Sequence, residues 1–264
     1  MQRCRMQAGD PFRLDGQSVL ITGAGGGIGR ALVAAFQAAG AVVAGADRED
    51  AAMDGLVLSH RLVFDIADAA ATGRAVSGLI AEAGAPDVLV NNAGHTSGET
   101  LAQVDGAVWD REIAVNLGGP FHVTAPVAAA MAARGSGAVV FISSVNALAH
   151  HGNPAYSAAK AGTVAYARAL AVEYGARGVR ANVVCPGSVR SPAWDHRFER
   201  NPALLDRIAP HYPLGRMVEA GEVARAALFL ASPAASGVTG AVLPVDAGLM
   251  AGNLRFVRDV IGGP

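Results

Sequence analysis

Residues 18–30 read SVLITGAGGGIGR, and this stretch decides the fold. Its apolar run, SVLIT (18–22), is typical of a buried strand, and a glycine-rich turn separates it from a helix-like segment that begins near Arg30. Glycines in such a turn let a pyrophosphate approach the backbone amides and the positive end of the helix. The spacing T-G-x-x-x-G-x-G departs from the strict G-x-G-x-x-G pattern. It predicts a dinucleotide site on Gly23, Gly25, Gly27, Ile28 and Gly29; a purely structural turn is the alternative.

Strand-like and helix-like segments alternate along the whole chain. Short apolar runs lie at 18–22, 41–46, 61–64, 87–91, 138–143, 179–185 and 241–245. Apolar residues recur at helical spacing in segments between or after these runs, at 29–37, 67–83, 155–174 and 219–231. This alternation predicts an α/β fold, a doubly wound Rossmann-type three-layer sandwich with helices on both faces of a parallel sheet.

The length of the chain favours one domain. A chain of 264 residues, 52% of them hydrophobic, can bury one large core, which we place at 14–264. The N-terminal extension, 1–13, is a candidate for disorder. The longest irregular stretch, about 187–218, is rich in Pro, Arg and His, and long loops inside compact domains are usually functional. We therefore expect a lid at about 190–213.

Charge and composition exclude several classes of protein. The formal net charge of -1 gives no basic field to attract nucleic acid or anionic lipid. No stretch reads as a membrane span, and the first residues lack the apolar core of a signal peptide. The two cysteines suggest neither a disulfide framework nor a zinc site. We expect a cytoplasmic protein without a nucleic-acid or membrane partner.

The second strand-like run ends close to Asp47, about 20 residues beyond the glycines, where a carboxylate can accept hydrogen bonds from the ribose hydroxyls. That carboxylate would repel a 2′-phosphate, so the sequence predicts NAD, with NADP less favoured. Arg48 complicates this choice because its guanidinium could pair with the phosphate. The alternative for Asp47 is a plain surface turn. Asp65, after the third strand, could accept from the adenine amino group, and the small residues of Asn91–Gly94 would let backbone approach the cofactor.

Tyr156 and Lys160 are four residues apart on a predicted helix, which places phenol and ammonium on one face. An adjacent ammonium favours the phenolate, and we expect it to lower the pKa of Tyr156 toward neutrality for proton exchange with an alcohol or carbonyl oxygen. Ser144, after the fifth strand, could stabilise charge on the same oxygen. The alternative is an ordinary surface pair. However, Lys160 is the only lysine among 21 basic residues, so we expect this position to require a compact ammonium rather than a guanidinium.

Taken together, the stretches 22–29 and 91–94 with Asn116, Ser144, Tyr156, Lys160 and Pro186-Gly187 resemble the classical short-chain dehydrogenase/reductase family in order and spacing. The resemblance covers about 14–250. It implies a seven-stranded doubly wound sheet, Tyr/Ser/Lys chemistry without metal, and commonly a homotetramer. It also implies that Asn116 holds a water linking Lys160 to solvent. Tyr156 follows Ser144 by one residue fewer than is frequent in that family, so Ser143 remains an alternative.

The expected cofactor contacts combine these inferences. The full set is Gly23, Gly25, Gly27, Ile28, Gly29, Asp47, Arg48, Asp65, Ile66, Asn92, Ala93, Gly94, Tyr156, Lys160, Pro186, Gly187, Val189 and Ser191. The residues expected to line the substrate pocket by position are His95, Ser144, Asn146, His150, Tyr156, Val189 and Trp194, with Phe198 and His211 from the lid. Neither histidine 150 nor 151 has the partners of a metal site, and no catalytic metal is predicted.

These features predict an NAD-dependent oxidoreductase that moves a hydride between a secondary alcohol or ketone and the nicotinamide. Tyr156 would be the general acid/base, assisted by Asn116, Ser144 and Lys160. The alternative enzyme is an NADPH-dependent 3-oxoacyl-carrier-protein reductase, which Asp47 disfavours. A non-catalytic dinucleotide-binding regulator is a third hypothesis, and the intact Ser144, Tyr156 and Lys160 argue against it.

Overall fold

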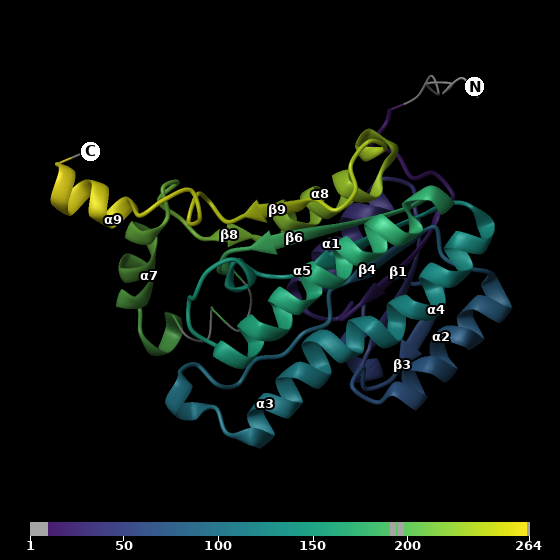
Figure 1. Cartoon of the computed structure of the whole chain (residues 1–264), viewed down its shortest axis with the longest axis horizontal. Helices are drawn as coiled ribbons and strands as arrows, with labels where there is room; N and C mark the ends of the chain where they lie inside the picture. The colour runs from purple at the N-terminus through teal and green to yellow at the C-terminus, as the bar shows by residue number, and fades with distance from the viewer. Residues whose placement is uncertain (1–9, 191–193, 195–197, 263–264) are drawn as a thin grey trace.

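A computed structural model describes residues 10–190, 194 and 198–262. Its centre is a parallel sheet of seven strands in the order β3-β2-β1-β4-β5-β6-β9 (Figure 1). The strands are β1 (Ser18–Thr22), β2 (Val42–Asp47), β3 (Arg61–Val63), β4 (Val88–Asn91), β5 (Gly137–Ile142), β6 (Val179–Pro186) and β9 (Val242–Val245). Two short strands, β7 (Val189–Arg190) and β8 (Val218–Glu219), form a separate parallel pair. The predicted doubly wound sandwich is confirmed.

Helices cover both faces of the sheet (Figure 1). One face carries α2 (Ala69–Ala83), α4 (Gly119–Arg134) and α5 (Pro154–Tyr174), and the other carries α1 (Gly27–Ala38) and α8 (Ala220–Ala231). The remaining α-helices described are α3 (Gly106–Ile113), α7 (Ala203–Ile208) and α9 (Leu254–Phe256), and π-helical turns span Ala114–Gly118 and Val257–Ile261.

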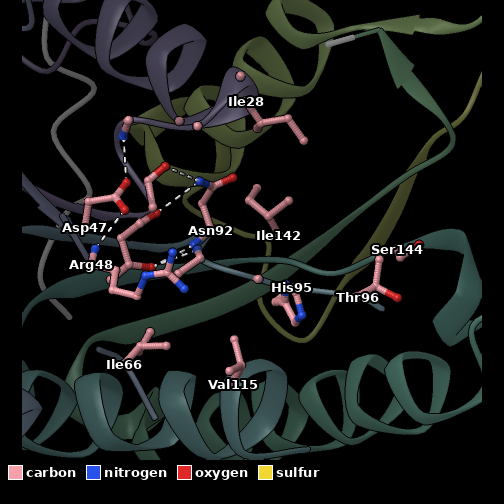
Figure 2. A pocket seen from close by; sticks show the side chains of 18 of the residues that line it. Ile28, Asp47, Arg48, Ile66, Asn92, His95, Thr96, Val115, Ile142 and Ser144 are labelled. Carbon is pink, nitrogen blue, oxygen red and sulfur yellow. Dashed lines mark hydrogen bonds between the residues drawn. The ribbon is translucent and has the colours of Figure 1, made fainter. Parts of the chain in front are cut away.

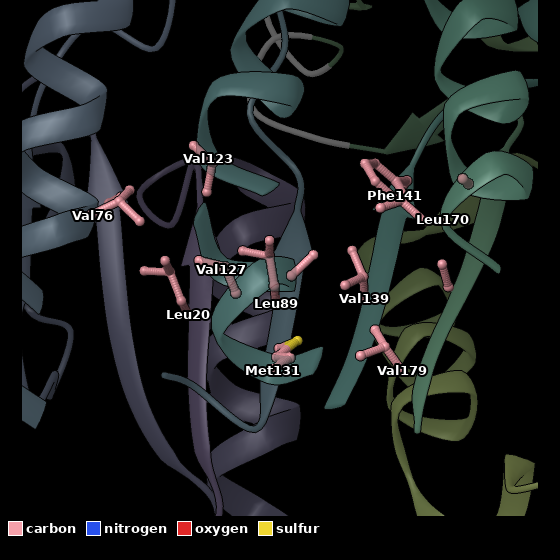
Figure 3. Packing of buried hydrophobic residues seen from close by; sticks show 14 of the residues in the cluster. Leu20, Val76, Leu89, Val123, Val127, Met131, Val139, Phe141, Leu170 and Val179 are labelled. Carbon is pink, nitrogen blue, oxygen red and sulfur yellow. The ribbon is translucent and has the colours of Figure 1, made fainter. Parts of the chain in front are cut away.

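Alternating side chains along each strand pack into two separate hydrophobic cores, one on each face of the sheet. Leu20 and Leu89 point to the side of α2, α4 and α5, where they pack with Val127, while Ile21 and Val90 point to the side of α1 and α8. Figure 3 shows the first of these cores. A strand buried on both faces needs apolar residues at every position, and this explains the continuous apolar runs in the sequence.

The sequence pattern did not reveal α3 and α4. Gly118 precedes α4, Gly119 and Pro120 are its first two residues, and Pro126 lies further inside it. Glycine and proline are the residues that most oppose helix in an isolated chain. Here α4 is stabilised by tertiary packing, since Val123, Val127 and Met131 are fully buried against the sheet.

The first described residues are held against the domain. Phe12 lies against Phe229 with ring centroids 6.3 Å apart, and the Ala234 N–H donates to the Pro11 carbonyl at 3.0 Å. Residues 1–9 of the expected extension, and residues 191–193 and 195–197 of the expected lid, lie outside the described residues. No described helix has the length and apolar character that crossing a membrane requires.

Candidate active site

A cleft of about 840 Å³ opens at the carboxyl ends of the strands. The strand order reverses between β1 and β4, and ligands of open α/β sheets bind at such a switch point. Figure 2 shows Asp47 and Arg48 toward one end of the cleft and His95, Thr96 and Ser144 toward the other. The predicted residues that line it are Gly23, Gly25, Gly27, Ile28, Gly29, Asp47, Arg48, Asp65, Ile66, Asn92, Ala93, Gly94, His95, Ser144, Tyr156, Lys160, Pro186, Gly187, Val189 and Trp194.

The glycine turn is packed too tightly to admit side chains. Gly23 has a φ of +64°, and a Cβ added to Gly25 would lie 2.3 Å from the Ala52 carbonyl oxygen. A Cβ on Gly29 would lie 1.9 Å from the Gly23 oxygen. The first turn of α1 begins directly after this cradle, so its unpaired N–H groups face the cleft as a phosphate site requires. The cradle therefore fits a dinucleotide pyrophosphate.

Acidic groups dominate the β2 end of the cleft. The Asp47 carboxylate accepts from the Gly25 N–H at 2.9 Å and from the Arg48 N–H at 2.8 Å. The exposed Arg48 guanidinium is paired with Glu49 at 3.0 Å, and Glu49 also lines the cleft. These carboxylates can accept hydrogen bonds from a ribose diol.

The next pair of residues along this edge is Asp65 and Arg111, whose side chains lie 3.0 Å apart. The pKa of Asp65 is lowered, first by the hydrogen bond from the Ala67 N–H and then by Arg111. Ile66 and Val115 line the cleft beside them, which gives a flat ring an apolar surface. The sequence did not indicate Arg111, because a lone arginine on a helix reads as a solvent-exposed residue.

Asn92 fixes the end of β4 against the end of β1. Its side-chain amide donates to the carbonyls of Thr22 and Gly23, each at 3.0 Å. The Thr22 hydroxyl in turn accepts from the N–H groups of Asn92 and Ala93. These bonds hold the glycine turn and the 92–94 segment together, and this gives Asn92 a structural task besides its place in the cleft.

Tyr156, Ser144 and Lys160 come together at the other end of the cleft. Lys160 is 3% exposed, and its ammonium donates to the Ile142 carbonyl at 2.9 Å and lies 5.5 Å from the centre of the Tyr156 ring. Ser144 is held by Asn146, whose N–H donates to the serine hydroxyl at 3.1 Å. The sequence motif thus becomes a compact group of a phenol, a hydroxyl and an ammonium.

The pKa values of this group differ from our expectation. Burial raises the pKa of Tyr156 to about 12, although its hydrogen bond with Ser144 acts in the opposite direction. Burial also lowers the pKa of Lys160 to about 8. The predicted fall of the tyrosine pKa toward neutrality is therefore wrong for the protein alone, because desolvation outweighs the ammonium, which bonds a backbone carbonyl instead.

Asn116 lies behind the cleft wall and is fully buried in the π-helical turn between α3 and α4. Its side chain accepts from the His95 N–H at 3.0 Å and donates to the Glu112 carbonyl at 2.9 Å. A Cβ on Gly94 would lie 3.0 Å from Asn116 Oδ1 and 3.5 Å from Lys160 Nζ. Gly94 thus allows both groups to approach the same point.

Several residues expected in the substrate pocket lie elsewhere. Asn146 does not line the cleft, because its amide donates to Gly152 O at 2.8 Å and to Ser157 Oγ at 3.2 Å. His150 is exposed outside the cleft, and His211 lines a separate groove beside α9.

Trp194 does line the cleft, and Phe198 stacks on it with centroids 5.7 Å apart. Ser191 lies outside the described residues. Thr96, Val115, Ile142 and Ser188 line the cleft without a signal in the sequence. Among the described residues, no His, Cys, Asp or Glu cluster is arranged to hold a metal ion.

A Rossmann-type sheet with this cleft and this Tyr/Ser/Lys group defines the class of dinucleotide-dependent oxidoreductases. Residues 23–250 match the family model described as enoyl-(acyl carrier protein) reductase. The chain belongs to the classical short-chain dehydrogenase/reductase family.

Individual relatives cover nearly the whole chain. The chain is 42% identical over 247 residues to galactitol 2-dehydrogenase (L-tagatose-forming) of Cereibacter sphaeroides, covering 90% of this chain and 96% of the relative. A crystal structure of a short-chain oxidoreductase from Burkholderia thailandensis superposes with a TM-score of 0.87 at 44% identity, covering 94% and 98% of the two chains. A gluconate 5-dehydrogenase from Burkholderia cenocepacia, in complex with NADP and tartrate, matches at 33% identity and a TM-score of 0.85, covering 92% and 98%.

Proposed function

We propose that the protein is an NAD-dependent dehydrogenase of secondary alcohols, acting on the CH–OH group and producing the ketone. The convergence of Tyr156, Ser144 and Lys160 at the end of the cleft opposite Asp47 carries this proposal. We also propose, from the family resemblance, a cytoplasmic homotetramer.

The cofactor would lie along the carboxyl edge of the sheet. The glycine cradle would hold its pyrophosphate, Asp47 its adenosine ribose, Asp65 and Ile66 its adenine, and the 186–189 segment would border the nicotinamide. When bound, the nicotinamide supplies the position that accepts or returns the hydride. Lys160 and Tyr156 would also contact the nicotinamide ribose, as the family resemblance implies.

Tyr156 would move the proton. Because burial raises its pKa to about 12, the phenol keeps its proton at neutral pH in the protein alone and is ready to donate to a ketone oxygen. Oxidation needs the deprotonated form, so alcohol oxidation should speed up with rising pH. The Ser144 hydroxyl would donate to the same substrate oxygen, and the 3%-exposed Lys160 ammonium would stabilise negative charge near it.

The walls around this point support a polar substrate. His95, Thr96, Ser144 and Ser188 all line the cleft at this end, and they offer hydrogen bonds to hydroxyl groups beside the reacting carbon. Galactitol, which appears in the name of one relative, is a polyol with hydroxyl groups on neighbouring carbons. We therefore propose polyols as the first substrate class to screen, with Trp194 packing against their carbon chain.

A substrate screen tests the proposed activity. Purified protein should reduce NAD in the presence of at least one secondary polyol, with initial rates that rise between about pH 7 and pH 10, measured by absorbance of the reduced nicotinamide. The Tyr156→Phe protein, which lacks the phenol hydroxyl, is the negative control for this assay. Reduction of acetoacetyl thioesters with NADPH, with no oxidation of any alcohol by NAD, would instead support a 3-oxoacyl-carrier-protein reductase.

Cofactor choice should follow Asp47. In Asp47→Ser, the carboxylate that accepts from the Gly25 N–H and would repel a 2′-phosphate is gone, and the neighbouring Arg48, now paired with Glu49, could pair with the phosphate instead. We expect kcat/KM for NAD to fall about tenfold and kcat/KM for NADP to rise about tenfold. Each change corresponds to roughly the free energy of one charge-assisted hydrogen bond.

Asp50→Ser is the control, because Asp50 pairs with Arg61 and does not line the cleft. It should leave the ratio of the two cofactors unchanged. A wild-type protein that already works better with NADP than with NAD would show that this interpretation of Asp47 is incorrect.

A further inference from the structure

Glu112, on α3, is a fully buried carboxylate next to the proposed active site. Its Oε1 accepts from the N–H groups of Ser97 at 2.6 Å and Gly98 at 3.1 Å, and from the Ser97 hydroxyl at 3.1 Å. The Thr96 hydroxyl donates to the same oxygen at 3.4 Å. Oε2 is buried without a hydrogen-bond partner among the described residues. One carboxylate oxygen thus accepts hydrogen bonds from each of the residues 96–98.

This carboxylate carries its charge at neutral pH. Burial alone would raise the pKa of Glu112, but the hydrogen bonds from the Ser97 and Gly98 backbone and the Ser97 side chain, together with the nearby backbone N–H of Tyr156, hold it below its ordinary value. Within the described ranges, no basic side chain forms an ion pair with Glu112. A buried, ionised carboxylate without a cation is rare, and it depends on such N–H donors.

Two further contacts connect Glu112 to the site. Its backbone carbonyl accepts from Asn116 Nδ2, and the same amide group donates to the His95 carbonyl at 2.6 Å. On the other side, Asn153 Nδ2 donates to the Thr96 hydroxyl at 3.0 Å and to Gly98 O at 3.2 Å. The segment 95–98 is therefore bound between α3 and the start of α5, one turn before Tyr156.

We propose that Glu112 is a positioning residue that clamps the 95–98 segment to the start of α5 and thereby fixes the Tyr156 hydroxyl relative to Ser144 and the substrate. This rests on the proposed function. His95 and Thr96 line the substrate end of the cleft (Figure 2), so the same clamp sets one wall of the pocket. The charge of Glu112 also disfavours the phenolate and keeps the proton on Tyr156.

The charged and titratable groups described around Tyr156 come from four segments. They are Glu112 on α3, Lys160 on α5, Cys185 on β6 and His95 after β4. Lys160 is the only lysine or arginine among these groups, and its positive charge acts on the Tyr156 phenolate in the opposite direction to the negative charge of Glu112. Removal of the Glu112 charge should therefore make Tyr156 easier to deprotonate.

Glu112→Gln tests the clamp, since the amide oxygen can still accept from the Ser97 and Gly98 N–H groups but the charge is lost. We expect kcat to fall about tenfold with the Kd for NAD within about twofold of wild type. The rise of kcat/KM for alcohol oxidation with increasing pH should occur about half a pH unit lower than in wild type. The Ser97 and Gly98 amides should exchange hydrogen at least about tenfold faster.

Asp110→Asn is the matched control, an exposed acid on the same helix, and it should change none of these quantities. If Glu112→Gln does not fold, Ser97→Ala takes its place: it removes one donor to Glu112 and keeps the charge, so it should show a smaller fall in kcat and a smaller rise in amide exchange, without the shift in pH dependence.

Unchanged kcat, unchanged pH dependence and unchanged amide exchange in a folded Glu112→Gln protein would overturn the proposal, as would a loss confined to thermal stability. The exchange measurement needs no substrate. If wild type oxidises no alcohol yet the Ser97 and Gly98 amides respond as expected, the clamp stands and the proposed function fails.

Discussion

Tyr156→Phe is expected to lower kcat/KM for alcohol oxidation by about 1,000-fold or more, within the range of a general acid/base contribution. The change removes one oxygen and leaves the ring, which packs 5.5 Å from the Lys160 ammonium. Cofactor binding should change by less than about threefold, because most of the cleft is untouched. Steady-state kinetics and a fluorescence titration with NADH measure the two quantities.

Tyr166→Phe provides the control for the loss of a phenol hydroxyl from α5. Tyr166 packs against Phe121 and Phe141 and does not line the cleft. This variant should keep activity within about twofold of wild type. A Tyr156→Phe protein with activity within about tenfold of wild type would remove Tyr156 from the proton transfer and with it the proposed mechanism.

Lys160→Arg is expected to lower kcat/KM by at least about 100-fold although it keeps the charge. Lys160 is 3% exposed, its ammonium donates to the Ile142 carbonyl, and a Cβ on Gly94 would already lie 3.5 Å from that ammonium. A wider planar guanidinium does not match that position, and it stays charged at all relevant pH, whereas the pKa of Lys160 is lowered to about 8. Kinetics from about pH 6 to pH 10, with circular dichroism to verify the fold, check this result.

The reverse substitution on the same helix, Arg168→Lys at an exposed position, should leave kcat/KM unchanged and serves as the control. If Lys160→Arg kept activity within about threefold of wild type over that pH range, the single lysine would be an accident of composition.

The fold was largely predictable because buried parallel strands need continuous apolar runs. The glycine turn, Asp47, and the Tyr156 and Lys160 pair were also predictable, since each follows from a local spacing that the structure preserves. Asn146 and His150 were placed in the pocket by their distance from Ser144 along the chain. The short turn at Val145–Ala147 instead directs the Asn146 side chain to Gly152 and Ser157.

The electrostatics of the site could not be predicted from spacing. The high pKa of Tyr156 arises from burial, and burial depends on neighbours distant in sequence. Glu112 gave no signal at all, because a single glutamate on a helix is usually a solvent-exposed residue. Its contacts with Ser97 and Gly98 exist only after α3 has packed against the 95–98 segment.

The π-helical turn at Ala114–Gly118, where the Gly119 N–H donates to the Ala114 carbonyl, holds more residues than an ordinary α-helical turn. Each added residue rotates the following helix by about 100°. The turn therefore sets the phase between α3, which presents Glu112 to the active site, and α4, which presents Val123 and Val127 to the sheet. Losing one residue here would restore a regular helix and turn one of these faces away. The length of this segment is thus constrained in addition to the identity of Asn116 within it.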